Sequence, residues 1–223
     1  MIPAVGRIRG IRAVIFDMDG TLVDSEPFTG RCVRRMLTAQ GIADPELDMR
    51  QFHGCTWRSI ADALVSRHPQ LSGVCTPERL DDGFEALWEE APPPYIKGAH
   101  RALAAAHRHA RTAICTSSRR PAVARLVARR GLAPLVDRIV CADDFGPSKP
   151  DPACFLLAAD RLGVLPSACL VFEDSVAGQT AALRAGMTVV GIGQPRRHPP
   201  GVHCTIPDYT SLPGDFFERA CDR

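Results

Sequence analysis

The chain has 223 residues, 45% of them hydrophobic, which fits one sizeable domain or a core domain with a smaller insert. A formal net charge of +2 with interspersed acids and bases argues against a nucleic-acid partner, and no run approaches the roughly 18–20 apolar residues of a membrane span, so we expect no membrane partner. The nine cysteines include no Cys-x-x-Cys pair, which argues against a disulfide framework or a zinc site and favours a reducing, cytoplasmic location.

The first predicted element is a strand at residues 12–17, a continuous apolar run that ends in Asp17. A run without polar alternation is typical of a strand buried on both faces of a parallel sheet. Asp19 follows with one residue between the two aspartates, and Gly20 comes next. Two neighbouring carboxylates at the end of a buried strand are either a functional pair or the start of an ordinary Asp-Gly turn.

The next segment carries helical patterns and no clear strand. Helices are predicted at 28–41, 57–69 and 77–91, and the prolines at 92–94 form a stiff connector. We therefore expect a helical cap domain at 25–93, inserted into a core domain made of residues 1–24 and 94–223.

The second half of the chain alternates between strand and helix patterns. Strands are predicted at 111–117, 137–143, 168–174 and 187–193, and helices at 98–110, 119–131, 151–162 and 175–185. Gly131, Gly163 and Gly186 lie where C-cap glycines belong. The alternation predicts an α/β fold, with a Rossmann-like parallel sheet flanked by helices. A short strand near 203–206 and a helix at 211–220 are expected to follow a loop.

Polar side chains follow these strands at their carboxyl ends, where open parallel sheets bind ligands. They are Thr116, Ser117 and Ser118 after the second strand, Lys149 beyond the third, and Glu173 and Asp174 at the end of the fourth. Several carboxylates in one pocket cannot all stay ionised without a counter-charge, which a hard cation such as Mg²⁺ would supply. One carboxylate could then attack phosphorus, a second act as general acid and base, and a hydroxyl and a lysine hold the phosphoryl oxygens.

Each of these residues also has a purely structural explanation. Residues 116–118 fit an N-cap for the helix that follows them, and Lys149 fits a solvated loop lysine. Residues 173–175 fit acidic and polar groups at the start of a helix. Their joint occurrence at successive strand ends favours a shared role in phosphoryl transfer.

The segment DMDGT at 17–21, Thr116, Lys149 and EDS at 173–175 resemble the four motifs of the haloacid dehalogenase-like hydrolase superfamily in order, spacing and strand-end position. KPDP and FEDSVAG are specific companions of the last two motifs. The resemblance covers residues 11–193. A helical insert directly after the first motif resembles the type 1 cap of the β-phosphoglucomutase-like phosphatases.

This resemblance implies a Mg²⁺-dependent phosphatase, a phosphoric monoester hydrolase acting on a small phosphorylated metabolite. Asp17 would become an aspartyl phosphate, while Asp19 would protonate the leaving group and later activate water. Mg²⁺ would be bound by the Asp17 carboxylate, the Asp19 backbone carbonyl and Asp174, with Glu173 in support.

The resemblance also implies where the substrate binds. The candidate substrate-binding residues are Thr116, Ser117 and Lys149 in the core and Arg50, His53 and Trp57 in the cap. The cap residues lie in RQFHGCTWRSI, which resembles the cap segment that faces the active site in relatives. Trp57 has an equally good explanation as part of the cap core. A phosphorylated sugar or sugar acid is the substrate expected by analogy.

Two other functions stay open. Dehalogenases of similar fold lack the second aspartate, so Asp19 favours phosphoryl chemistry. A phosphomutase resembling β-phosphoglucomutase would need gating residues at the positions of Thr29, His53 and Trp57, and all three depart from that pattern. A non-catalytic binding protein on the same fold would be expected to lose one of the four motifs, and none is lost. We expect a monomer or a weak homo-oligomer.

Overall fold

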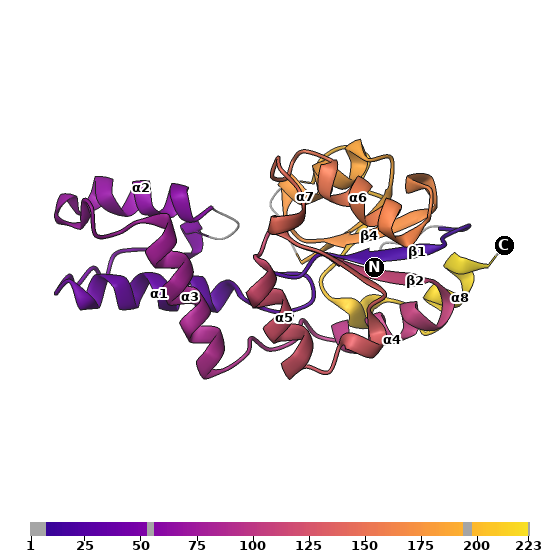
Figure 1. The fold of residues 1–223 in the computed structure, drawn as a ribbon, viewed down its shortest axis with the longest axis horizontal. Helices are drawn as coiled ribbons and strands as arrows, with labels where there is room; N and C mark the ends of the chain where they lie inside the picture. The colour runs from indigo at the N-terminus through magenta and orange to yellow at the C-terminus, as the bar shows by residue number, and fades with distance from the viewer. Residues whose placement is uncertain (1–7, 53–55, 194–197, 223) are drawn as a thin grey trace. The chain divides into compact units, whose positions relative to one another are not determined.

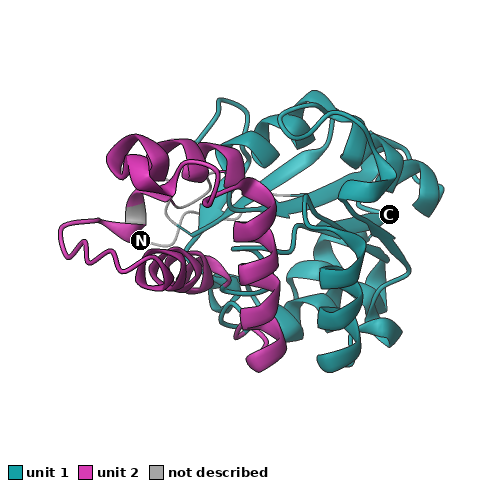
Figure 2. Ribbon diagram, turned by 60° about the vertical axis from the view of Figure 1, so that its left-hand side comes forward, with its two compact units in different colours: residues 1–24, 95–223 teal, residues 25–94 magenta. Residues whose placement is uncertain are grey.

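The computed structural model describes residues 8–52, 56–193 and 198–222 and divides into two compact units. Unit 1 comprises Met1–Asp24 and Tyr95–Arg223, and unit 2 comprises Ser25–Pro94 (Figure 2). Within the described residues, all named strands belong to unit 1, and no helix is long and apolar enough to cross a membrane.

Unit 1 is built on a six-stranded parallel sheet with the order β3-β2-β1-β4-β5-β6. The strands are β1 (Ala13–Phe16), β2 (Arg111–Cys115), β3 (Arg138–Val140), β4 (Cys169–Glu173), β5 (Thr188–Ile192) and β6 (Cys204–Ile206). All six predicted strands are present. β1 pairs with β2 on one side and β4 on the other, which places Phe16 opposite Ile114 and Phe172.

Helices cover both faces of this sheet (Figure 1). They are α4 (Ala99–His109), α5 (Arg120–Arg129), α6 (Ala153–Leu162), α7 (Val176–Arg184) and α8 (Phe216–Cys221). α6 and α7 pack on the face that carries Ile15 and Val171. On the opposite face Phe16 and Phe172 stack with ring centroids 5.2 Å apart, and α8 covers Phe172. The predicted α/β, Rossmann-like fold is confirmed, because both faces are buried as a parallel sheet requires.

The three glycines predicted to end α5, α6 and α7 all have positive φ values. This left-handed conformation is typical of a C-cap and costs glycine little.

Unit 2 consists of helices and turns. Its helices are α1 (Glu26–Ala39), α2 (Trp57–Arg67) and α3 (Pro77–Glu90), with 3₁₀ turns at Met49–Phe52 and Pro69–Leu71. The hydroxyls of Thr56 and Thr76 accept hydrogen bonds from the first turns of α2 and α3, which fixes where these helices begin. Arg35 of α1 donates to both carboxylate oxygens of Glu90 of α3, at 2.6 and 2.8 Å. The three predicted helical segments are thus present.

The C-terminal helix is shorter than the sequence predicts. We expect it at 211–220, whereas α8 begins at Phe216. Leu212 is extended, with ψ of 135°, as a residue before a proline usually is, so Pro213 prevents a helix from running through this point. Residues 194–197 of the predicted loop lie outside the described residues.

Candidate active site

The carboxyl ends of β1, β2 and β4 bring predicted site residues together in unit 1. Asp17 follows β1, Thr116 follows β2, and Glu173 is the last residue of β4. The backbone N–H of Asp17 donates to the carbonyl of Phe172 at 3.0 Å, and that of Thr116 donates to Val140 at 2.9 Å. These bonds continue the ladder by one residue and hold both side chains at the edge of the sheet.

Lys149 is a buried cation at this edge. Its Nζ lies 2.6 Å from Oδ1 of Asp17 and 2.8 Å from Oε2 of Glu173. The exposed fraction of the side chain is 7% for Lys149, 7% for Asp17 and 1% for Glu173. The alternative of a solvated loop lysine is therefore wrong. An ion pair this deeply buried persists because its partners offset the cost of removing the charges from water.

Glu173 accepts hydrogen bonds on both of its carboxylate oxygens. Oε2 accepts from Lys149, while Oε1 accepts from the backbone N–H of Ser175 at 2.9 Å and from its hydroxyl at 2.8 Å. Ser175 also caps α7, since its hydroxyl accepts from the N–H of Gly178 at 3.0 Å. The capping explanation of residues 173–175 is therefore correct for Ser175, whereas Glu173 faces the cation.

Gly178 leaves the space that the Glu173 carboxylate occupies. A Cβ at this position would lie 2.0 Å from Oε2 of Glu173. We expect Gly178→Ala to lower the free energy of unfolding by about 1–3 kcal/mol, although alanine normally favours a helix over glycine. Thermal denaturation measures the change. Gly214→Ala, where a Cβ would meet no atom within 4 Å, is the control, and a Gly178→Ala protein as stable as wild type would contradict the prediction.

Asp174 completes a cluster of three carboxylates with Asp17 and Glu173. One oxygen from each lies within 4.8 Å of the others. The hydroxyl of Thr21 donates to Oδ1 of Asp174 at 3.0 Å. Gly20 has φ of +76°, and a Cβ there would lie 2.3 Å from Oδ2 of Asp174. The Asp-Gly turn is thus part of how the cluster is built, because only glycine leaves room for the carboxylate.

The cluster of three carboxylates carries more negative charge than the single positive charge of Lys149 can neutralise. Burial raises the pKa of Asp17 to about 8, with the charge of Glu173 adding to the rise and Lys149 opposing it. Burial, then Glu173 and Asp17, raise the pKa of Asp174 well above its usual value. Burial alone would lower the pKa of Lys149, but Asp17 and Glu173 outweigh it and hold that pKa well above its ordinary range. The excess negative charge is one that a divalent cation would offset.

Asp19 has different partners from Asp17. The hydroxyl of Ser118 donates to Oδ2 of Asp19 at 2.7 Å, and that of Thr116 lies 3.5 Å from the same oxygen. Asp17 is instead paired with Lys149. One intervening residue therefore separates the two aspartates into two electrostatic environments.

The three polar residues after β2 also differ from one another. Thr116 is 1% exposed, Ser117 is exposed and Ser118 is partly buried. The N-cap residue of α5 makes no side-chain cap bond, and the N–H of Arg120 donates to Oδ2 of Asp143 at 2.7 Å. The N-cap explanation of residues 116–118 is therefore wrong, because the acceptor comes from the segment after β3.

The cap candidates lie in unit 2 and are only partly described. His53 lies outside the described residues, and only the backbone of Arg50 is described, in a 3₁₀ turn. Trp57 begins α2, where its Nε1 donates to Oδ1 of Asp81 at 3.0 Å and its ring meets that of Phe84 edge-on at 5.3 Å. These contacts favour the explanation of Trp57 as part of the core of unit 2.

Sequence reasoning did not assign a role to three residues that support the site. Thr21 ends the DMDGT motif, and Ser118 is one of the polar residues that follow the second predicted strand, so its position at a strand end was the signal for it. Gln179 is fully buried, and its Nε2 donates to the carbonyl of Glu173 at 3.1 Å, while Oε1 lies 3.1 Å from Nδ1 of His198. No pattern identifies it, because backbone carbonyls are acceptors that any sequence supplies.

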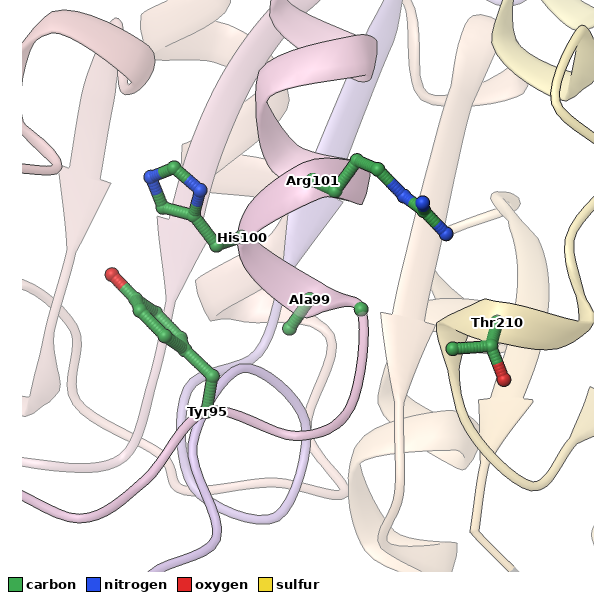
Figure 3. A pocket seen from close by; sticks show the side chains of 6 residues that line it. Tyr95, Ala99, His100, Arg101 and Thr210 are labelled. Atoms are coloured by element: carbon green, nitrogen blue, oxygen red, sulfur yellow. The ribbon is translucent and has the colours of Figure 1, made fainter.

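A second feature of unit 1 is a hollow at the start of α4, and none of the three carboxylates lines it. It is lined by Tyr95, Gly98, Ala99, His100, Arg101 and Thr210 (Figure 3). The polar groups do not converge: the ring of His100 and the hydroxyl of Tyr95 lie on one side of the helix, while the guanidinium of Arg101 extends on the other. The Tyr95 hydroxyl donates to the carbonyl of Arg130 at 3.5 Å. We therefore assign no ligand to this hollow.

Comparisons with known proteins agree on one family. A family model described as haloacid dehalogenase-like hydrolase matches residues 11–186. The fructose-1-phosphate phosphatase YqaB of Escherichia coli is 32% identical over 183 residues, 80% of this chain and 95% of that protein. The 6-phosphogluconate phosphatase of Escherichia coli is 30% identical over 206 residues, 91% of each chain. A crystal structure of a putative β-phosphoglucomutase from Thermotoga maritima has a TM-score of 0.71 at 30% identity, covering 88% of this chain and 94% of that one.

Proposed function

Because the chain belongs to the haloacid dehalogenase-like hydrolase family, we propose that it is a phosphatase that hydrolyses a small phosphorylated metabolite through an aspartyl-phosphate intermediate. The family match confirms the superfamily predicted from the four strand-end motifs. The proposal rests above all on Asp17, which is buried at the end of β1 and paired with Lys149 at 2.6 Å. Asp19, two residues on, has hydroxyl partners of its own, Ser118 and Thr116.

The two aspartates divide the reaction between them. A carboxylate oxygen of Asp17 attacks phosphorus, the P–O bond to the substrate breaks, and the leaving oxygen takes the electron pair and a proton from Asp19. Water then attacks the acyl phosphate, gives a proton to Asp19 and releases inorganic phosphate with the free Asp17 carboxylate. Lys149 and Thr116 lie at the same strand edge and would bind phosphoryl oxygens during both steps. Each turnover consumes one water and restores both aspartates.

The donor set of the site fits Mg²⁺. Asp17 and Asp174 offer hard oxygen ligands within 4.8 Å of each other, and the backbone carbonyl of Asp19 is the third candidate ligand. When bound, Mg²⁺ supplies positive charge against the carboxylates and the phosphoryl group. Both oxygens of Glu173 already accept hydrogen bonds, so we assign Glu173 a supporting role.

Mg²⁺ is expected to raise the melting temperature of the wild-type protein, and more strongly at about pH 8 than at about pH 6. The pKa of Asp17 is raised to about 8, so at lower pH the cation must displace a proton. A concentration of about 100 times Kd corresponds to roughly 2.7 kcal/mol of stabilisation. Thermal denaturation with MgCl₂ and with EDTA measures the shift. Asp174→Asn is expected to lose most of it and the exposed Asp160→Asn none; equal shifts in all three proteins would count against the metal site.

We propose a sugar phosphate or phosphorylated sugar acid as substrate, with unit 2 as the cap that selects it. The two phosphatases compared above are named for fructose 1-phosphate and 6-phosphogluconate. Arg50, His53 and Trp57 stay candidates for contacting the non-reacting part of the substrate. Phosphate release from those two compounds, glucose 6-phosphate and p-nitrophenyl phosphate tests the proposal. We expect release that EDTA abolishes and Mg²⁺ restores; no release from any of the four would contradict the function.

A phosphomutase is the second candidate, because the chain is similar to a putative β-phosphoglucomutase. The departures at Thr29, His53 and Trp57 from the mutase pattern speak against it. Incubation with β-glucose 1-phosphate separates the two activities. Formation of glucose 6-phosphate would support the mutase and free phosphate the phosphatase, whereas a binding protein would produce neither.

A further inference from the structure

The hydroxyl of Ser118 contacts one of the two reacting side chains. Ser118 Oγ donates to Oδ2 of Asp19 at 2.7 Å, whereas the hydroxyl of Thr116 is 3.5 Å from that oxygen. A hydroxyl–carboxylate distance of 2.7 Å is that of a strong hydrogen bond, and 3.5 Å is that of a weak one. Of these two contacts, the one from Ser118 dominates.

Ser118 is held in place by its own backbone. Its N–H donates to the hydroxyl of Thr116 at 3.0 Å, and its carbonyl accepts from the N–H of Ala142, also at 3.0 Å. Thr116 follows β2 and Ala142 follows β3, so the segment that carries Ser118 is tied to two strand ends. A donor fixed in this way can orient a carboxylate.

Asp19 benefits from such orientation because a general acid must bring its proton within hydrogen-bond reach of the leaving oxygen. When Oδ2 accepts a hydrogen bond from Ser118, the transferable proton is carried by the other oxygen, Oδ1. Holding Oδ2 therefore selects both the oxygen that delivers the proton and the rotation of the side chain.

We propose that Ser118 is a positioning residue for proton transfer by Asp19, holding Oδ2 so that Oδ1 delivers the proton to the leaving oxygen. This inference rests on the proposed phosphatase function. It gives Ser118 no direct contact with the phosphoryl group. Removal of the hydroxyl then affects substrates according to how much their leaving group needs a proton.

Two substrates with different leaving groups test the proposal. p-Nitrophenyl phosphate releases a stabilised phenolate that departs without a proton, whereas a sugar phosphate releases an alkoxide that must be protonated as it leaves. kcat/KM covers binding and the step in which the leaving group departs, and excludes the later hydrolysis of the acyl phosphate. For Ser118→Ala we expect kcat/KM to fall roughly 10- to 100-fold for the sugar phosphate and less than about threefold for p-nitrophenyl phosphate.

The sugar phosphate is whichever of fructose 1-phosphate, 6-phosphogluconate and glucose 6-phosphate the wild-type protein hydrolyses fastest. Ser118→Thr keeps the hydroxyl and is expected to recover most of the lost kcat/KM; failure to recover it would count against the proposal. Ser167→Ala removes an exposed hydroxyl of unit 1 and is the matched control. Melting temperatures verify that each variant is folded.

Equal losses on the two substrates would overturn the positioning role, because they would indicate direct contact with the phosphoryl group or general distortion of the site. No loss on either substrate would also overturn it. A wild-type protein that hydrolyses neither substrate would instead refute the proposed function itself.

Discussion

Asp17→Asn is expected to abolish hydrolysis of p-nitrophenyl phosphate, with a loss on the order of 10⁴-fold or more, as for other covalent nucleophiles. An amide oxygen cannot form the acyl phosphate. The substitution is nearly isosteric and leaves Lys149 paired with Glu173 at 2.8 Å, so the geometry of the site is expected to persist.

The same substitution is not expected to destabilise the metal-free protein. The pKa of Asp17 is raised from 3.8 to about 8 in the folded state, first by burial and then by the charge of Glu173. A carboxyl group with a raised folded-state pKa stabilises the fold at low pH and loses that contribution as the pH rises toward about 8, so near neutral pH its ionised form is unfavourable. Asparagine cannot ionise, so it removes this cost.

Asp17→Asn is therefore expected to abolish activity without lowering the stability of the metal-free protein. Phosphate release with Mg²⁺ measures the first, and the melting temperature without Mg²⁺ near pH 7 measures the second. Asp160→Asn, an exposed position on α6, is the matched control and is expected to change neither. Substantial turnover by folded Asp17→Asn would refute Asp17 as the nucleophile, and a sharply lowered melting temperature would refute the unfavourable buried charge.

Lys149→Met is expected to lower the free energy of unfolding by about 3–5 kcal/mol near pH 8 and to reduce turnover by roughly 10²- to 10³-fold. Lys149 lies 2.6 Å from Asp17 and 2.8 Å from Glu173, and all three side chains are at most 7% exposed. Methionine fills similar space without charge, so two buried carboxylates lose their cation. Asp17 then takes up a proton more readily, and a protonated carboxyl is a poor nucleophile.

This loss of stability is expected to depend on pH. Removing Lys149 raises the folded-state pKa of Asp17 further, because the lysine charge opposes the rise in the wild-type protein. Below about pH 8 Asp17 is protonated in both folded proteins. Above about pH 8 the wild-type carboxyl ionises while that of the variant stays protonated, so the destabilisation is expected to grow as the pH rises above about 8. Urea denaturation at about pH 7 and about pH 9.5 measures the difference.

Lys97 is the other lysine of the chain and is exposed, so Lys97→Met serves as the matched control. An equal loss for Lys149→Met at both pH values would show that charge is not the cause. It would point instead to lost contact with Phe155, whose ring centroid lies 5.0 Å from Nζ of Lys149.

Most secondary structure could be predicted because it depends on local pattern. The run at 12–17 predicts β1, since continuous apolar residues bounded by a turn form a buried strand. The start of α8 is an exception, because the prediction rested on the helical pattern of apolar residues alone. Pro213 keeps Leu212 out of the helical region, and so the helix begins later than the pattern indicates. The capping role of Asp143 toward α5 was missed for another reason, since donor and acceptor are 23 residues apart.

The sequence by itself determined the chemistry available to this protein. Residue type and position after an apolar run identify the candidates Asp17, Asp19, Lys149 and Asp174, and both are local properties. Their order and spacing were enough to identify the family.

Only the tertiary structure decided which of these groups share a contact. From the sequence alone, Lys149 could equally be a solvated loop lysine. The fold places it against Asp17, 132 residues away, at the edge where β1 and β4 pair. The roles of Gly178 and Ser118 likewise depend on the fold. Gly178 leaves space for the Glu173 carboxylate, and the hydroxyl of Ser118 donates to Asp19. Space and hydrogen-bond direction arise between segments that are far apart in the sequence, so no local pattern contains them.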